Sequence, residues 1–146
     1  MVLWFDVVSV FVVSFGLLAG HNIAGMSRTE LKVGQRYFPI LERLLLSVVV
    51  FYSANEFIDW RFSLGISMLL FAVLWEYPLR NLLLTSGILG LASSLSSFNI
   101  FAYSFLYFIV RGTQNYYHKE SMKTLLTGMG VYIVIGILSL LLTSFF

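Results

Sequence analysis

Charged residues near the ends of apolar stretches are the first candidates for chemistry. A charge buried in hydrocarbon is costly, so it is usually kept where it serves an ion or proton pathway. A membrane-end charge site would consist of Glu42, Arg43, Glu76 and Arg80. In the structural alternative, which we favour because all four lie near segment ends, the Glu42 carboxylate complements a helix start and Arg43 extends to lipid headgroups. Glu76 and Arg80 then form an ion pair across four residues.

Histidine, glutamate and asparagine side chains occur in two polar stretches, residues 21–36 and 111–123. Histidine serves as a metal ligand or general base, and glutamate is a frequent partner in both roles. A polar site formed by these two stretches, on the face of the membrane that they share, would use His21, Asn22, Glu30, His118 and Glu120. Their spacing fits no metal motif such as His-Glu-x-x-His, and no nucleotide-binding or hydrolase motif occurs elsewhere. We therefore predict no catalytic residue, no metal and no cofactor, and we favour a protein that is not an enzyme.

Serine and asparagine side chains interrupt the apolar stretch of residues 81–110 near its middle. These residues are Ser93, Ser94, Ser96, Ser97 and Asn99. Polar groups and irregular backbone at membrane depth are tolerated where they face protein or water. The cluster therefore predicts the polar lining of a path for a solute.

The composition requires a lipid environment for the elements that carry these residues. Of the 146 residues, 59% are hydrophobic and 11% are charged, whereas soluble domains carry about 25% charged residues. The mean hydropathy is +0.89, and the apolar residues form long uninterrupted runs. The absence of cysteine excludes disulfides and thiolate ligands. We predict an integral, multi-pass protein of the cell membrane that does not bind nucleic acid.

Hydropathy predicts an all-α, polytopic membrane bundle formed by a single domain, residues 1–146. Its segments are residues 2–20, 39–57, 62–77, 81–95, 98–110 and 125–146. The stretch 81–110 is about twice as long as one helix needs, so we divide it into two segments. Each extends roughly 22 Å, against a hydrocarbon core of about 30 Å. These two segments are therefore either short spans or a re-entrant hairpin.

The distribution of basic residues supports this division. Of the nine Lys and Arg residues, all except Arg61 fall on one side of the six-segment arrangement. Basic residues concentrate on the cytoplasmic side of membrane proteins. The polar stretches 21–36 and 111–123 are therefore expected in the cytoplasm, with both chain termini outside. A single helix between Arg80 and Arg111 would lose this bias, whereas a re-entrant hairpin would keep it.

Small residues recur at helical spacing and predict close packing between helices. Gly16 and Gly20 form a GxxxG motif, and a second face carries Ser86, Gly90, Ser94 and Ser97. Such faces let backbones approach closely, within one chain or between copies. Besides the lipid bilayer, the expected partners are therefore further copies of the chain or other membrane subunits that bind through these faces.

Three functions remain open from the sequence. The first is transport or permeation of a neutral or lipid-like solute by an oligomer, with the serine-rich segment lining the path. The second is a non-catalytic subunit or assembly factor of a larger membrane complex, which the small extramembrane mass would suit. The third is a lipid-modifying enzyme with its site on the cytoplasmic face. We favour transport slightly, and it would explain a re-entrant or broken hairpin, since irregular backbone at membrane depth is tolerated only beside protein or water.

Overall fold

The computed structural model describes residues 2–27, 29, 33–76, 81–95, 97–119 and 121–145. The regular structure of these residues is helical, which confirms the predicted all-α class for this part of the chain. The helices are α1 (Val2–Met26), α3 (Phe38–Asn55), α4 (Trp60–Glu76), α5 (Leu82–Ala92), α6 (Phe98–Tyr117) and α7 (Met122–Phe145), with a short 3-10 turn, η1 (Ser93–Leu95), after α5.

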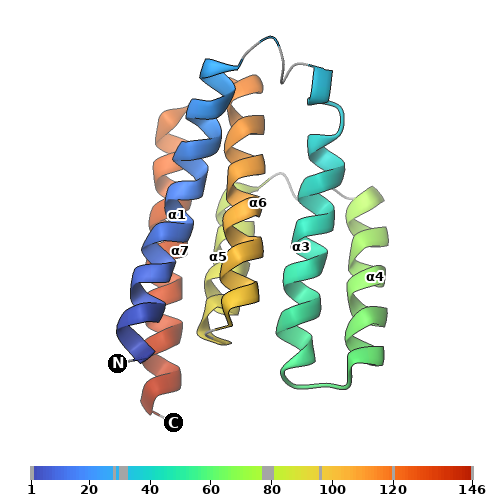
Figure 1. Ribbon diagram of the computed structural model, residues 1–146, viewed down its shortest axis with the longest axis vertical. Helices are drawn as coiled ribbons and strands as arrows, with labels where there is room; N and C mark the ends of the chain where they lie inside the picture. The colour runs from blue at the N-terminus through green and yellow to red at the C-terminus, as the bar shows by residue number, and fades with distance from the viewer. Residues whose placement is uncertain are drawn as a thin grey trace.

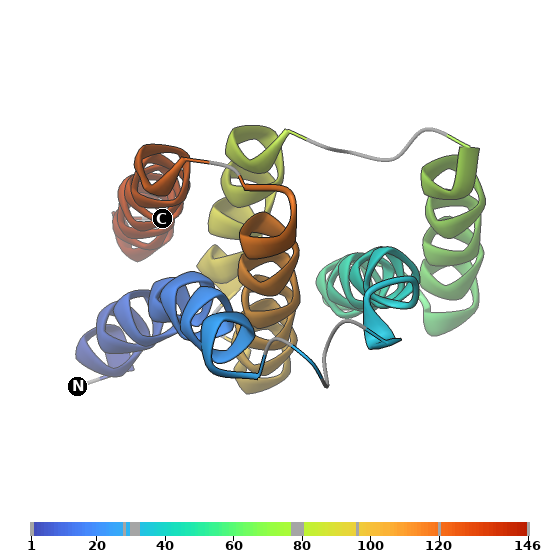
Figure 2. The same ribbon diagram turned by 90° about the horizontal axis from the view of Figure 1, so that it is seen from above.

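Helix α6 is the central element of the arrangement. The helices α1, α5, α6 and α7 form one group, and α3 and α4 lie beside it (Figure 1). Seen from above, α6 lies between α1 and α3, and α4 lies on the far side of α3 (Figure 2). Helix α6 packs along both α1 and α3, while α5 packs along α7 and α4 packs along α3. The peripheral pair α3 and α4 is therefore joined to the rest mainly through α6.

The two ends of the bundle differ in what they carry. Both chain termini lie at one end, with the α3–α4 and α5–α6 connections (Figure 1). We call this the terminal end. Helices α1 and α6 end, and α3 and α7 begin, at the opposite end, which we call the polar end. Helix α5 has 11 residues and η1 has 3, so together they extend roughly 22 Å. Helix α5 begins part-way along α6 (Figure 1).

Small residues bring the backbones of α1 and α6 into direct contact. A Cβ added at Gly20 would collide with the backbone of α6, and one added at Gly112 would collide with the backbone of α1. The Thr113 hydroxyl donates a hydrogen bond across this contact to the carbonyl of Gly20, at 3.2 Å. The GxxxG motif of Gly16 and Gly20 therefore packs α1 against α6 within the chain.

The second small-residue face also packs within the chain. A Cβ added at Gly90 of α5 would lie 3.1 Å from the backbone carbonyl of Tyr132 on α7. The Ser139 hydroxyl of α7 donates a hydrogen bond to the Gly90 carbonyl at 3.1 Å. Ser86 on the same face is fully buried. Close backbone approach between α5 and α7 is thus the structural role of this face.

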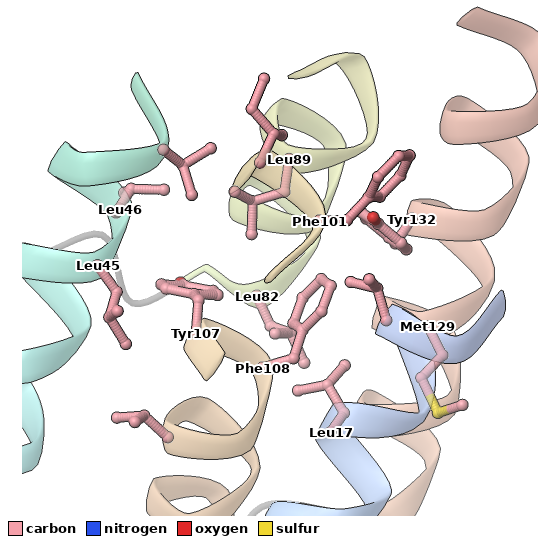
Figure 3. Packing of buried hydrophobic residues seen from close by; sticks show 14 of the residues in the cluster. Leu17, Leu45, Leu46, Leu82, Leu89, Phe101, Tyr107, Phe108, Met129 and Tyr132 are labelled. Carbon is pink, nitrogen blue, oxygen red and sulfur yellow. The ribbon is translucent and has the colours of Figure 1, made fainter. Parts of the chain in front are cut away.

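The apolar core lies around the middle of α6. Tyr107 and Phe108 are fully buried, and they extend to different sides of the helix (Figure 3). Tyr107 lies toward Leu45 of α3, whereas Phe108 lies toward Leu17 of α1. The Phe108 ring also meets the ring of Tyr132 edge-on, with centroids 4.9 Å apart. Adjacent residues of α6 therefore hold the two groups of helices together.

The outer surface of the helices is apolar as well. On α4, Phe62, Met68 and Leu69 are 68%, 64% and 68% exposed. Three helical stretches are long and apolar enough to cross a membrane, namely Trp4–Met26, Phe38–Asn55 and Met122–Thr143. Monomeric soluble proteins rarely expose large contiguous apolar patches.

Two helices are longer than the sequence predicts. The predicted ends are Gly20 and Val110, but α1 continues to Met26 and α6 to Tyr117. His21, Asn22 and residues 111–117 are therefore helical, and the expected loops are correspondingly shorter. The cause is tertiary: the α1–α6 contact continues past both predicted ends, with Ala24 of α1 and Gly112 of α6 buried in it.

Candidate functional site

A buried ion pair joins α3 to α6 on the side of the polar end. The Nη1 atom of Arg111 lies 3.4 Å from Oε1 of Glu42. The Tyr107 hydroxyl donates a hydrogen bond to the same carboxylate oxygen at 3.0 Å. The side chains of Arg111 and Glu42 are only 7% and 12% exposed. Each charge is compensated in a place where an uncompensated one would cost several kcal/mol.

Helical spacing explains why these groups meet. Positions 107, 111, 114 and 118 follow one another at intervals of four, three and four residues, which keeps their side chains on one side of α6. Arg111 and Gln114 of this set are buried, and Tyr107 is fully buried. Because this side of α6 faces α3, it directs both the ion pair and the polar groups that follow it toward the same partner helix.

Several buried polar atoms near the end of α6 have no hydrogen-bond partner among the described residues. They are Nε2 of Gln114, both side-chain polar atoms of Asn115, the hydroxyl of Tyr117 and Nδ1 of His21. Leaving a buried polar atom unpaired costs about 1–3 kcal/mol. Native proteins keep few such atoms, and each calls for an explanation such as a bound water, ion or ligand. These atoms gather at the polar end, where a bound ligand would gain hydrogen bonds with them.

A pocket of about 470 Å³ opens at the polar end, and Gln114 and Tyr117 of these residues line it. Its wall is formed by Val33, Gln35, Arg36, Pro39, Gln114, Tyr117 and His118. Pro39 precedes Glu42 by three residues on α3, and Gln114 follows Arg111 by three residues on α6. The pocket therefore lies one helical turn from the ion pair, and the pair joins the two helices that form its walls.

The end of α6 places His118 and Tyr117 at this pocket. Lys119 follows with a φ of 53°, the left-handed conformation that commonly terminates a helix. The backbone N–H groups of His118 and Lys119 donate to the carbonyls of Gln114 and Tyr116. The chain thus turns sharply away from the helix axis, and the last side chains of α6 stay at the pocket wall.

The structure describes three of the four residues of the predicted membrane-end charge site. Glu42 pairs with Arg111, whereas the Arg43 guanidinium lies over the Trp75 ring of α4, 5.4 Å from its centroid. Glu76 is exposed at the end of α4. Arg80 lies outside the described residues. Glu42 and Arg43 are adjacent on α3 and yet contact different helices: Glu42 pairs with α6, and Arg43 packs against α4.

The structure describes His21, Asn22 and His118 of the predicted cytoplasmic-face polar site. The His21 ring on α1 packs edge-on against Tyr116, with centroids 5.2 Å apart, whereas His118 lines the pocket. Asn22 is exposed, and Glu30 and Glu120 lie outside the described residues. Within the described part of the chain, no group of three or more His, Asp or Glu side chains could hold a metal ion.

The predicted serine-rich path contains the break between α5 and α6. The Ser93 hydroxyl donates to the Gly90 carbonyl at 2.6 Å, and that of Ser94 donates to the Leu91 carbonyl at 2.8 Å. Ser97 is the N-cap of α6, Asn99 is exposed in its first turn, and Ser96 lies outside the described residues. Ser93 and Ser94 thus bond to their own helix, and a solute path through these residues stays a prediction.

Of the residues that form the ion pair and the pocket wall, only Glu42 and His118 are among the predicted site residues. The sequence predicts a polar loop at Arg111 and Gln114, because a charge following the apolar residues 98–110 resembles the end of a span. The spacing of Tyr107, Arg111, Gln114 and His118 was nevertheless readable, since it continues the helical period past Val110. The partner of Arg111 had no such signal, because Glu42 lies on a distant segment.

Comparison with known proteins finds no matching family model, no matching curated protein and no matching solved structure.

Proposed function

We propose that this chain is a multi-pass membrane protein that binds a lipid-like solute at its polar end, as the recognition step of transport. In this proposal all six described helices cross or enter the bilayer, with the polar end in the cytoplasm and both termini outside. The apolar outer surface supports the membrane setting. Arg36, Lys119 and Lys123 belong to segments that meet at the polar end, while Arg61 begins α4 at the terminal end, which agrees with the positive-inside rule.

The observation that carries the proposal is the pocket wall at Gln114. This side chain is 5% exposed, its Nε2 has no hydrogen-bond partner among the described residues, and it lines the pocket. Ligand pockets typically combine apolar walls with a few polar groups that fix orientation. Val33 and Pro39 supply apolar surface here, beside the polar groups of α6. A solute with a polar head and an apolar body satisfies both.

The location favours a solute that reaches the pocket from the bilayer surface. Arg111 precedes the end of α6 by six residues, which places the ion pair about 9 Å from that end. The pocket lies nearer still, at the depth where headgroups meet hydrocarbon in the proposed orientation. A lipid-like solute would therefore keep its body in the bilayer while its head enters the pocket.

A lipid-movement assay tests the proposal. Purified protein is reconstituted into vesicles that contain a fluorescent phospholipid, and the exposure of inner-leaflet lipid to dithionite is followed over time. We expect faster exposure than in empty vesicles. Val33→Trp, which fills the pocket, should slow the exposure, whereas Val73→Trp on the exposed face of α4 should leave it unchanged.

Two results would count against the proposal. Wild-type vesicles that behave like empty ones would exclude movement of the labelled lipid as the function. Equal rates for Val33→Trp and wild type would show that the pocket is not the recognition site. Copurification of a different membrane protein in the first case would favour the complex-subunit hypothesis.

A further inference from the structure

We infer that the headgroup recognised by the pocket is anionic and carries a phosphate. This inference rests on the proposed function and specifies its solute. It follows from the polar groups of the pocket wall, from the fixed charges that lie nearest to them, and from the orientation of the two helices that meet there.

The polar groups of the pocket are mainly hydrogen-bond donors. Arg36 offers a guanidinium, His118 an imidazole, and Gln114 a buried amide nitrogen without a partner. The buried Tyr117 hydroxyl is likewise unpaired among the described residues and can donate. None of the described lining residues carries a carboxylate. Such a set binds an acceptor-rich anion better than a cation, and guanidinium groups suit phosphate oxygens in particular.

Among the described residues, the acid nearest to the pocket does not offset this preference. Glu42 lies one turn beyond Pro39, but its carboxylate is already paired with Arg111 at 3.4 Å and accepts the Tyr107 hydroxyl. The pair contributes no net charge to the pocket. The carboxylate of Glu42 therefore does not cancel the positive charge of Arg36.

The macrodipoles of α3 and α6 oppose each other at the pocket, so they do not determine whether it prefers an anion or a cation. Helix α3 begins at the pocket, with Pro39 in its first turn, and α6 ends there. A helix start carries a partial charge of about +0.5 and a helix end about −0.5. With these two opposed, the full positive charge among the described lining residues is that of Arg36. Its guanidinium lies 5.6 Å from the centroid of the Tyr37 ring, which anchors it beside the start of α3.

Native mass spectrometry of the detergent-solubilised full chain distinguishes the possible ligands. The probes are short-chain phosphatidic acid, diacylglycerol of the same chains, and inorganic phosphate. We expect phosphatidic acid to bind at least about tenfold more tightly than diacylglycerol, a ratio that corresponds to about 1.4 kcal/mol. Inorganic phosphate alone should bind more weakly than phosphatidic acid, because it has no apolar part to contact Val33 and Pro39.

Matched variants assign the effect to the pocket. Arg36→Gln should weaken phosphatidic acid binding at least about tenfold, and Gln114→Met should weaken it with no change of charge. Lys123→Gln removes one positive charge from the start of α7, outside the described pocket wall, and should leave binding unchanged. An equal loss in Lys123→Gln and Arg36→Gln would reveal general surface attraction and overturn the inference.

The probes separate failure of this inference from failure of the proposed function. Equal binding of diacylglycerol and phosphatidic acid, sensitive to Val33→Trp, would leave a lipid-binding pocket but overturn the anionic headgroup. Binding of neither lipid would overturn both. Binding of inorganic phosphate as tight as that of phosphatidic acid would keep the anion site and overturn the lipid-like solute.

Discussion

The guanidinium of Arg111 on α6 lies 3.4 Å from the carboxylate of Glu42 on α3, and both side chains are almost fully buried. The pair joins the α3–α4 unit to the rest of the bundle and lies one helical turn below the pocket. Removing one partner of a buried pair leaves the other charge without compensation, whereas removing both does not. This asymmetry gives the first prediction.

Glu42→Met should destabilise the protein by about 3–5 kcal/mol, because it removes the carboxylate that pairs with the buried Arg111 guanidinium. The double variant Glu42→Met/Arg111→Met should recover most of that loss, since both positions are then apolar. Thermal unfolding in detergent measures the difference. Glu76→Gln at the exposed end of α4 is the control and should change stability by less than about 0.5 kcal/mol. A double variant as unstable as the sum of its single substitutions would show that the two side chains do not interact.

Tyr107→Phe should cost about 1.5–3 kcal/mol, the range for a hydrogen bond to a charged group. The substitution removes the hydroxyl that donates to Glu42 at 3.0 Å and leaves the buried ring in place. Tyr132→Phe is the matched control, because the Tyr132 hydroxyl is buried with no partner among the described residues. Its removal should be neutral or stabilising. Equal losses in the two unfolding experiments would contradict the assigned hydrogen bond.

Gly20→Ala and Gly112→Ala should each destabilise the bundle by at least about 1–3 kcal/mol, because the new methyl group meets backbone that cannot move aside easily. Gly130→Ala is the control: a Cβ there meets nothing within 4 Å. Since alanine also favours the helix over glycine by about 1 kcal/mol, this control should be neutral or stabilising. Denaturant titration in mixed micelles compares the three. Tolerance of alanine at both Gly20 and Gly112 would rule out the close α1–α6 contact.

Single cysteines test the proposed topology, and the absence of native cysteine provides a clean background. A membrane-impermeant maleimide should label Asn99→Cys, at the terminal end, from outside the cell. It should label Gln35→Cys, at the polar end, only after the membrane is opened. Labelling of Asn99→Cys from the cytoplasmic side would instead indicate a re-entrant hairpin between residues 81 and 110.

The sequence predicts the helices of this fold better than their ends. The apolar runs locate all six described helices, and the serines of residues 93–97 locate the break between α5 and α6. The fall in hydropathy at His21 and at Arg111 predicts that a loop starts at each of them. Both are helical because packing between α1 and α6 outweighs the local change in polarity. Helix ends set by such contacts cannot be read from one segment alone.

The candidate site was predictable on α6 but not between helices. The period that links Tyr107, Arg111 and Gln114 is a property of one segment, so it is visible in the sequence. The pairing of Arg111 with Glu42 depends on which face of α3 meets α6. Arg43 shows the difficulty, since it is adjacent to Glu42 and yet contacts α4. Only the packed arrangement of helices distinguishes these partners.

Photo-crosslinking from the pocket tests the central claim most directly. Benzoylphenylalanine is placed at Val33 in the pocket wall or at Val73 on the apolar face of α4, and the adducts formed in native membranes are identified by mass. The Val33 position should capture a restricted set of phosphate-bearing amphiphiles, whereas the Val73 position should capture lipids in proportion to their abundance. The same lipid mixture at both positions, or no lipid at Val33, would contradict a solute-binding pocket at the polar end.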